Sequence, residues 1–276
     1  MKKIYFAKSH IVAVLTALAS IVATPTQAAG DLLVAPTRVV IDNSGTTQVI
    51  LNNIGAEPAT YRVSLEVKRM NANGMLDDVA ESSFTAVDTA TIGMISYSPR
   101  RITLPPNQPQ IIRLAIRPDP ALPDGEYRVH MLFRAIPSAK AATTQVQAVE
   151  GLSIALTPIY GVTIPIILRK GEVQSTTAIA NPHLITSNGS NSFAFTMSRK
   201  GNGSVYGDVI VTKPGVAEPL LVARGIAAYP EVNERLVSIP IPSELATQLK
   251  GAVKVQLIQP ATDGAGTLAE VQAVIR

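Results

Sequence analysis

The sequence lacks cysteine and tryptophan, and its aromatic residues amount to only 4%. The absence of cysteine excludes a disulfide framework, a cysteine metal site and a cysteine nucleophile, so stability must come from the burial of apolar side chains. The scarcity of aromatic residues argues against a carbohydrate-binding protein, because such sites commonly need exposed aromatic side chains. No stretch free of charges and proline reaches the ~18–20 apolar residues that a membrane-spanning helix needs.

The first residues are typical of a secretory signal peptide. The basic residues Lys2, Lys3 and Lys8 precede the apolar stretch Ile11–Val22, and small residues follow it. Cleavage is expected after Ala28 or after Ala29. We predict a signal peptide over residues 1–28. The mature protein is then expected to be soluble and exported, without insertion into a membrane.

Removal of the signal peptide leaves the mature chain nearly neutral. The full chain has 24 basic and 20 acidic residues, and the three lysines of the signal region leave without an acidic residue. The mature chain therefore carries a net charge of about +1. Its basic residues are dispersed along the sequence, so neither a nucleic acid nor an anionic membrane is expected as a partner.

Short segments of alternating apolar and polar residues fill the chain after Asp31, and Pro, Gly, Asn and Asp separate them. The only helix candidate is short, at Ser243–Lys250 with Ser243 as its cap. This pattern predicts an all-β fold of two β-sandwich domains. The charged stretch Arg169–Glu172 ends the most apolar segment, and it marks the boundary between domains at residues 30–169 and 172–276.

The expected strands are the segments in which this alternation is clearest. They are Leu32–Ala35, Arg38–Ile41, Thr47–Asn52, Thr60–Arg69, Ile111–Arg117, Gly125–Ile136, Ser153–Leu156, Val162–Leu168, Thr176–Ala180, Ser192–Ser198, Val205–Thr212, Leu220–Ala228, Leu236–Ile239, Ala252–Leu257 and Leu268–Ile275. Turn residues lie between them, and we interpret Asn202-Gly203 as a hairpin turn.

The residue types that carry catalysis are sparse and poorly placed. Of the three histidines, His10 lies in the signal peptide, His130 lies in an apolar run where a hydrogen-bonded strand histidine is expected, and His183 lies in a proline-containing loop. No spacing supports a zinc site or a Ser-His-Asp arrangement. The pair Asp77-Asp78, expected in a polar loop, lacks the rest of a calcium-ligand loop. We therefore expect no enzyme activity, no cofactor and no metal.

The stretch Gly151–Gly171 carries an apolar face that is unusually long for a strand. Pro158 and Pro165 each remove a backbone donor, so we expect an edge strand, or a strand that pairs mainly on one side. The even-numbered positions repeat at the two-residue period of a strand and are Leu152, Ile154, Leu156, Pro158, Tyr160, Val162, Ile164, Ile166 and Leu168.

Two interpretations of this stretch are open. The whole segment is either a strand buried in its own sandwich, kinked between Pro158 and Gly161, or it contains a template onto which another chain adds a strand. In the second interpretation the template runs from Leu152 to Tyr160. Backbone pairing supplies affinity, and the apolar side chains enter the core of the partner.

Four stretches resemble landmarks of one protein family, in the same order along the chain. They are Thr37-Arg38-Val39-Val40, the proline-led segment Tyr97–Pro106 with its continuation Ile111–Leu114, the run Leu122–Arg128 followed by Ile136-Pro137, and Ser198–Asp208. Together they resemble the periplasmic pilus chaperones of the PapD type. The last stretch looks like the second domain of the archaic, or alternative, branch of that family.

The resemblance implies two immunoglobulin-like sandwiches in a boomerang arrangement, with Gly151–Gly171 as the last strand of the first. It implies a chaperone that stabilises pilus subunits by donor-strand complementation and delivers them to an outer-membrane usher. The donor strand comprises Leu152, Ile154, Leu156, Pro158 and Tyr160.

The resemblance also assigns Arg38 to grip the terminal carboxylate of the subunit. Better-known members add a lysine from the last strand, but here Pro165 aligns with that position. The second cation is thus unassigned, and the candidates by charge alone are Arg100, Arg101, Arg113, Arg128 and Arg134.

Two other classes of function were weighed against a chaperone. A pilus or surface structural subunit should be one incomplete sandwich with a free donor arm, whereas residues 30–276 predict two domains. A carbohydrate-binding sandwich is opposed by the scarcity of aromatic residues.

Overall fold

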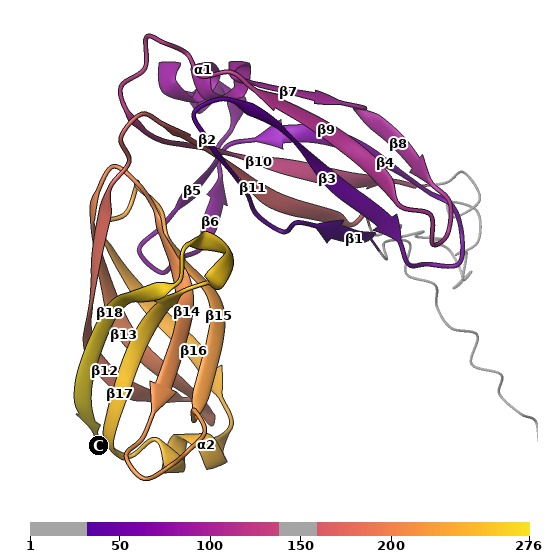
Figure 1. Ribbon diagram of the computed structural model, residues 1–276. Coiled ribbons are helices and arrows are strands. Elements are labelled where there is room, and N and C mark those ends of the chain that lie inside the picture. The colour runs from indigo at the N-terminus through magenta and orange to yellow at the C-terminus, as the bar shows by residue number, and fades with distance from the viewer. Residues whose placement is uncertain (1–31, 138–158) are drawn as a thin grey trace, which may run out of the picture.

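The computed structural model describes residues 32–137 and 159–276. Two β-sandwiches meet at an angle and form the two arms of a boomerang (Figure 1). The predicted all-β fold of two immunoglobulin-like sandwiches is thereby confirmed. The predicted signal peptide and the first part of the predicted donor strand, including Leu152, Ile154, Leu156 and Pro158, lie outside the described residues.

The first sandwich consists of two sheets that enclose one apolar core. One sheet has the order β1(Leu32–Ala35), β3(Gly45–Asn53), β9(Gln110–Ile116) and β7(Ile95–Ser98), and the other has the order β2(Val39–Asp42), β11(Gly161–Lys170), β10(Gly125–Ile136), β4(Ala59–Glu66) and β8(Arg101–Leu104). Alternate residues of β10, such as Val129, Met131 and Phe133, are fully buried between the sheets. The period-two pattern of the sequence therefore sets which face of β10 is the core face.

The second sandwich has a core of its own. One sheet has the order β12(Ser175–Ser187), β13(Ser190–Gly201) and β16(Glu234–Ile241), and the other has the order β15(Leu221–Ala228), β14(Val205–Thr212), β17(Gly251–Gln259) and β18(Gly266–Ile275). Phe193 and Phe195 are fully buried, with ring centroids 6.2 Å apart. β11 ends at Lys170 and β12 begins at Ser175, and the domain boundary expected near residues 169–172 stays a prediction.

Two α-helices and two 3-10 turns, η1(Glu81–Ser83) and η2(Ala261–Asp263), interrupt the strands. Helix α1(Ala86–Gly93) was not predicted, although Thr85 and Asp88 form a reciprocal capping box at its start. Helix α2(Ser243–Gln248) lies where a helix was predicted, but Pro242 precedes it as the cap residue, and the assignment of that role to Ser243 is wrong. No helix in the described ranges is both long enough and apolar enough to cross a membrane.

Three local expectations are corrected by the structure. Asn202 and Gly203 do not form a hairpin turn, because they join β13 to β14, which lie in different sheets. His183 lies in β12 at a register shift rather than in a loop, and its Nδ1 atom is 2.7 Å from the carbonyl oxygen of Asn181. Asp77 and Asp78 lie in the short strand β6(Leu76–Asp78), which pairs with β5(Lys68–Met70).

His130 is buried in β10 with 2% of its surface exposed, and neither ring nitrogen has a hydrogen-bond partner among the described residues. The expectation of a hydrogen-bonded histidine is therefore wrong. Burial above all, together with the positive charges of Arg128 and Lys68 and against an opposing effect of Asp78, lowers the pKa of the ring to about 3. The ring is neutral in the folded protein at neutral pH.

This burial makes the folded state sensitive to acid. The unfolded chain binds a proton at His130 below a pH of about 6.5, whereas the folded chain does not until about pH 3, so stability falls as the pH drops through this window. Between pH 7 and pH 4.5 we expect a loss of about 2–3 kcal/mol in the free energy of unfolding that a His130→Leu variant does not show. Urea denaturation at both pH values measures it.

A His183→Leu variant is the matched control, because the ring of His183 is exposed. It should keep the pH dependence of the wild type. Equal losses in wild type and His130→Leu would show that the buried ring is not the source of the acid sensitivity.

Candidate functional site

Arg38 lies where the chain crosses from one sheet of the first sandwich to the other. β1 pairs with β3, whereas β2 pairs in parallel with β11, and residues 36–38 connect them. The parallel ladder begins where Val39 pairs with Ile166, so Arg38 and Pro165 are the residues that directly precede its first pair. Pro165 in turn pairs with His130.

The guanidinium of Arg38 is held by residues of the second sandwich. Its Nη1 atom donates a hydrogen bond to Oδ2 of Asp263 at 2.9 Å, and its Cζ atom lies 4.3 Å from the ring centroid of Tyr206. Only 11% of the side chain is exposed. Its Nε and Nη2 atoms are buried and have no hydrogen-bond partner in the described part of the chain. Arg38 thus lies at the corner between the two arms.

β11 is paired on both sides over only part of its length. Residues 166–169 lie between β10 and β2, whereas residues 161–165 pair with β10 alone among the described residues. The expected edge strand is therefore present in the first half of β11 and absent from the second half. The backbone of the first half can accept a further strand, since edge strands present unpaired N–H and C=O groups.

The apolar row of β11 leaves the core toward its start. Ile166 and Ile164 are buried, Val162 is half-buried, and Tyr160 is 47% exposed. Tyr160 still continues the pairing with β10, because its carbonyl oxygen accepts a hydrogen bond from the backbone N–H of Ala135 at 2.9 Å. The row therefore turns from the protein's own core toward the surface at the position where the predicted donor strand ends.

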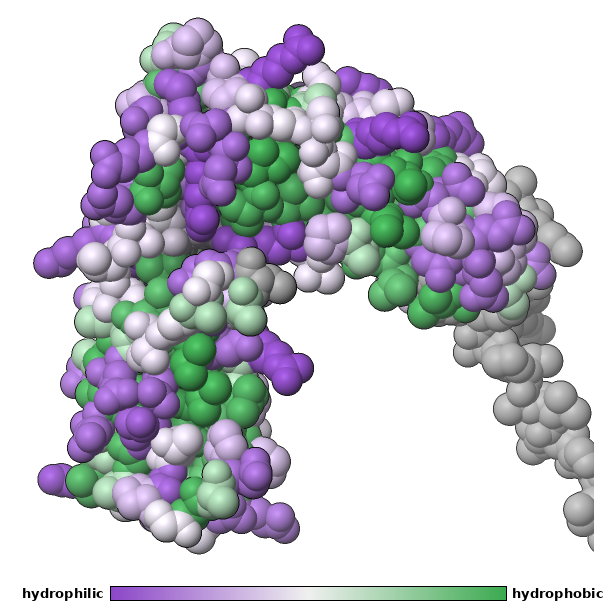
Figure 2. Space-filling model, viewed as in Figure 1, coloured by the Kyte–Doolittle hydropathy of each residue, from purple (hydrophilic) through white to green (hydrophobic). Residues whose placement is uncertain are grey.

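The first sandwich and the segment that leads into β11 also carry exposed apolar side chains. Figure 2 shows apolar surface on the arm that carries β1 and β3. Exposed large apolar residues of this part of the chain include Leu33, Ile54, Ile159 and Tyr160.

The five candidate second cations lie in different places. Arg100 and Arg101 lie at or beside β8, the edge strand opposite β2, and Arg113 lies in the other sheet. Arg134 pairs with Gly161 at the far end of β10 from the corner. Only Arg128, of these five, contacts residues of the second sandwich, where its Cζ atom lies 3.5 Å from the ring centroid of Tyr229.

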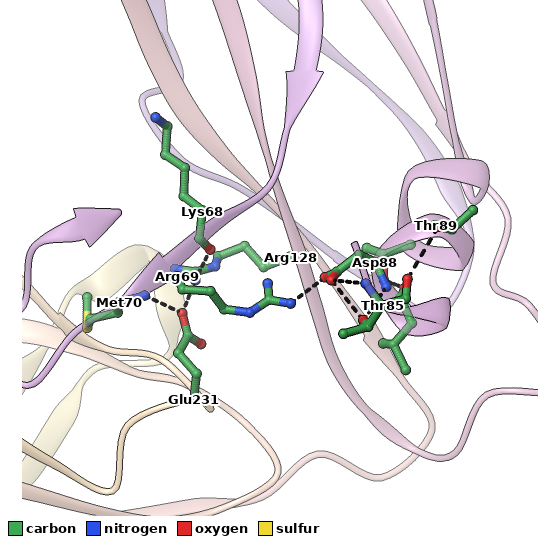
Figure 3. Close-up of polar contacts among 10 residues, drawn as sticks. Lys68, Arg69, Met70, Thr85, Asp88, Thr89, Arg128 and Glu231 are labelled. Carbon is green, nitrogen blue, oxygen red and sulfur yellow. Dashed lines mark hydrogen bonds and ion pairs between the residues drawn. The ribbon is translucent and has the colours of Figure 1, made fainter. Parts of the chain in front are cut away.

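Arg128 is already engaged, as Figure 3 shows. Its Nη2 atom donates hydrogen bonds to the backbone carbonyl of Lys68, at 3.1 Å, and to the carboxylate of Glu231, and the side chain is 6% exposed. Its Nη1 atom is buried without a partner in the described ranges. The contact with Glu231 ties the first sandwich to the second.

The hairpin of β5 and β6 forms an interdomain contact that sequence reasoning missed. Met70 belongs to the first sandwich in sequence but is buried in the core of the second. Its backbone N–H donates to Oε1 of Glu231 at 2.8 Å, and the backbone N–H of Leu236 donates to the carbonyl of Ala72, also at 2.8 Å. The base of the hairpin is held to α1 by an ion pair of Arg69 with Asp88 at 2.6 Å (Figure 3).

A second contact between the sandwiches joins Glu126 to Ser204. In the sequence, both residues lie in stretches that resemble the pilus chaperones, but nothing there indicated that they meet. Oε2 of Glu126 accepts hydrogen bonds from the backbone N–H and the hydroxyl of Ser204, at 3.1 and 2.8 Å, and lies 3.4 Å from Nε of Arg169. Arg199, which is 3% exposed, fixes the loop before Ser204, because it donates hydrogen bonds to the backbone carbonyls of Gly201 and Gly203 and to that of Val232. These contacts hold the corner in one geometry.

The chain resembles PapD-type periplasmic pilus chaperones in structure. A chain of the CsuC–CsuE chaperone–tip adhesion subunit complex from archaic Csu pili of Acinetobacter baumannii matches 90% of this chain and 100% of its own length, with 11% identity and a TM-score of 0.48. The Pseudomonas aeruginosa chaperone CupB2 matches 88% of this chain and 100% of its own, with 12% identity and a TM-score of 0.45. The E. coli chaperone DraB matches 89% and 96%, with 16% identity and a TM-score of 0.45. No protein-family profile and no curated protein sequence matches the chain.

The contact of Met70 with the second core gives a testable consequence. Met70→Ala leaves a cavity in that core, so we expect a loss of about 2–5 kcal/mol in the free energy of unfolding. We also expect a broader range of angles between the arms, since the hairpin no longer anchors them. Denaturation and small-angle scattering measure the two effects.

Met75→Ala is the matched control, because Met75 lies on the same hairpin and is 65% exposed. This variant should behave as the wild type does. A Met70→Ala protein that matched Met75→Ala in both measurements would refute the anchoring role of the hairpin.

Proposed function

We propose that this protein is a periplasmic chaperone that stabilises incomplete pilus subunits by lending them a strand. The observation that carries the proposal is the first half of β11, which has one strand neighbour among the described residues and whose apolar row leaves the core at Tyr160. A strand added there would complete the sandwich of the subunit with side chains of the chaperone.

The donated segment in this proposal runs from Leu152 to Tyr160. Burial of three large apolar side chains, those of Leu152, Ile154 and Leu156, contributes roughly 5–9 kcal/mol before the cost of ordering is subtracted. Backbone pairing adds direction and register. No nucleotide is needed, because the exposed core of the subunit is itself the driving force.

Arg38 fixes the end of the subunit in this proposal. In support, Arg38 directly precedes the first residue of β2 that pairs with β11, whereas residues 161–165 of β11 pair with β10 alone among the described residues. A charge-assisted hydrogen bond from a guanidinium to a carboxylate contributes about 1.5–3 kcal/mol, which suffices to select one register. The apolar side chains supply most of the affinity.

The remaining parts of the proposal come from the resemblance. The signal peptide at residues 1–28 directs the chain to the periplasm, and the domains span residues 30–169 and 172–276. Release occurs when a strand of another subunit replaces the donated strand at an outer-membrane usher.

The donor segment is tested by complex formation with a small pilin-like protein whose sandwich lacks one strand. We expect a soluble one-to-one complex in size-exclusion chromatography. Ile154→Asp or Leu156→Asp should abolish it, because a carboxylate cannot enter the core of the subunit unpaired. An intact complex with either variant would place the donor strand elsewhere.

The anchor is tested separately with Arg38→Ala. Loss of the charge-assisted contact should weaken the complex about 10- to 100-fold without preventing it. Arg101→Ala is the matched control, since Arg101 is exposed at the opposite edge of the same sheet. Equal affinities of the two variants, measured by titration calorimetry, would remove Arg38 from the binding site.

A further inference from the structure

Arg38 already has an anionic partner within its own chain. Asp263 belongs to the turn between β17 and β18 of the second sandwich, and its carboxylate forms an ion pair with the guanidinium at 2.9 Å. We infer that Asp263 is an internal competitor that occupies Arg38 until the terminal carboxylate of a bound subunit displaces it. This inference rests on the proposed function, because it takes Arg38 as the carboxylate anchor.

The cation of this pair is fixed, whereas the anion lies on an element that can shift. Arg38 is largely buried, stacks on Tyr206 and directly precedes a strand that is paired with β11. Asp263 is 30% exposed and ends η2, the short turn at the tip of the β17–β18 hairpin. The next residue, Gly264, has a φ of 123°, a conformation that favours glycine. A small movement of this turn would release the carboxylate without breaking either strand.

The unused edge of the guanidinium shows why an incoming carboxylate would replace Asp263. Asp263 contacts Nη1. The Nε and Nη2 atoms form a planar fork that matches a carboxylate, and both are buried without a hydrogen-bond partner among the described residues. Because this fork is buried, a ligand reaches it only after the turn that carries Asp263 has moved aside. Two carboxylates on one guanidinium also repel each other.

Competition of this kind sets a threshold for binding. The apparent dissociation constant equals the intrinsic one divided by the fraction of molecules in which Arg38 is open. A carboxylate that brings only its charge competes poorly with the tethered Asp263. A subunit whose strand also pairs with β11 is held close to Arg38, so its carboxylate displaces Asp263. Asp263 therefore favours ligands that offer both features.

The test uses a synthetic peptide of alternating valine and threonine with a free terminal carboxylate, together with the same peptide as its terminal amide. Both are titrated into the wild type and into Asp263→Asn. We expect Asp263→Asn to bind the carboxylate peptide about tenfold more tightly than the wild type does, because no anion has to be displaced. The amide should bind both proteins equally.

Glu270→Gln is the matched control for the change in net charge. Glu270 lies on β18, is exposed and pairs with Lys254 at 3.7 Å. This variant should bind both peptides as the wild type does. Thermal melting checks that Asp263→Asn is folded.

Three results would overturn the inference. Asp263→Asn could bind the carboxylate peptide no more tightly than the wild type, it could bind the amide more tightly as well, or Glu270→Gln could show the same gain.

Arg38→Ala separates this failure from a failure of the anchor. If Arg38→Ala abolishes the preference for the carboxylate while Asp263→Asn changes nothing, Arg38 is the anchor but Asp263 is not a competitor. If no protein prefers the carboxylate to the amide, both assignments are wrong.

Discussion

The unequal pairing of β11 is the constraint on which the site depends. β2 runs alongside β11 over only four residue pairs, because the preceding strand β1 belongs to the other sheet and the chain needs residues 36–38 to cross over. The first half of β11 consequently has one strand neighbour among the described residues. Proteins normally blunt such an edge with charge, yet residues 159–168 contain no charged side chain. An uncharged, apolar edge promotes aggregation when nothing covers it, but it suits a protein whose function is to pair with the strand of another chain.

Two arginine–carboxylate pairs cross the corner, and their surroundings suit different roles. Arg128 and Glu231 are joined to the backbone of the β5–β6 hairpin, and Arg128 is 6% exposed. Breaking a buried pair of this kind is costly, about 3–5 kcal/mol, because it leaves a charge without a partner. Asp263 is more exposed and lies in a turn, so water can solvate its carboxylate after separation. The first pair therefore suits a structural contact and the second an exchangeable one.

The sequence specifies most of the strands but little of the corner. β10 and β14 match the predicted bounds residue for residue, because strict alternation and flanking turn residues are local signals. Helix α1 escaped prediction because its buried residues, Asp88 and Thr91, are polar, so no apolar stripe marks it. The predicted strand Thr60–Arg69 breaks at Val67 in the structure. The burial of Met70 in the other core depends on the angle between the arms, which no local pattern encodes.

The same limit applies to the site. The Thr-Arg stretch drew attention to Arg38. The alternation in β11 indicated the row of apolar side chains that reaches the surface at Tyr160. Asp263 is separated from Arg38 by 225 positions and sits in a turn with no distinguishing motif, so only the folded chain brings them together.

The resemblance to pilus chaperones implies a second cation near Arg38, but Pro165 stands at that position in the sequence. Pro165 pairs with His130, and the residue after it, Ile166, pairs with Val39, which follows Arg38. His130 cannot supply the missing charge, because its pKa of about 3 keeps the ring neutral. With Asp263 in contact, the charge of Arg38 is balanced within the chain. A cation that is already balanced attracts free anions less than an unpaired cation does. In the proposed function, recognition therefore relies more on strand pairing than on charge, in agreement with the long apolar face in the sequence before β11.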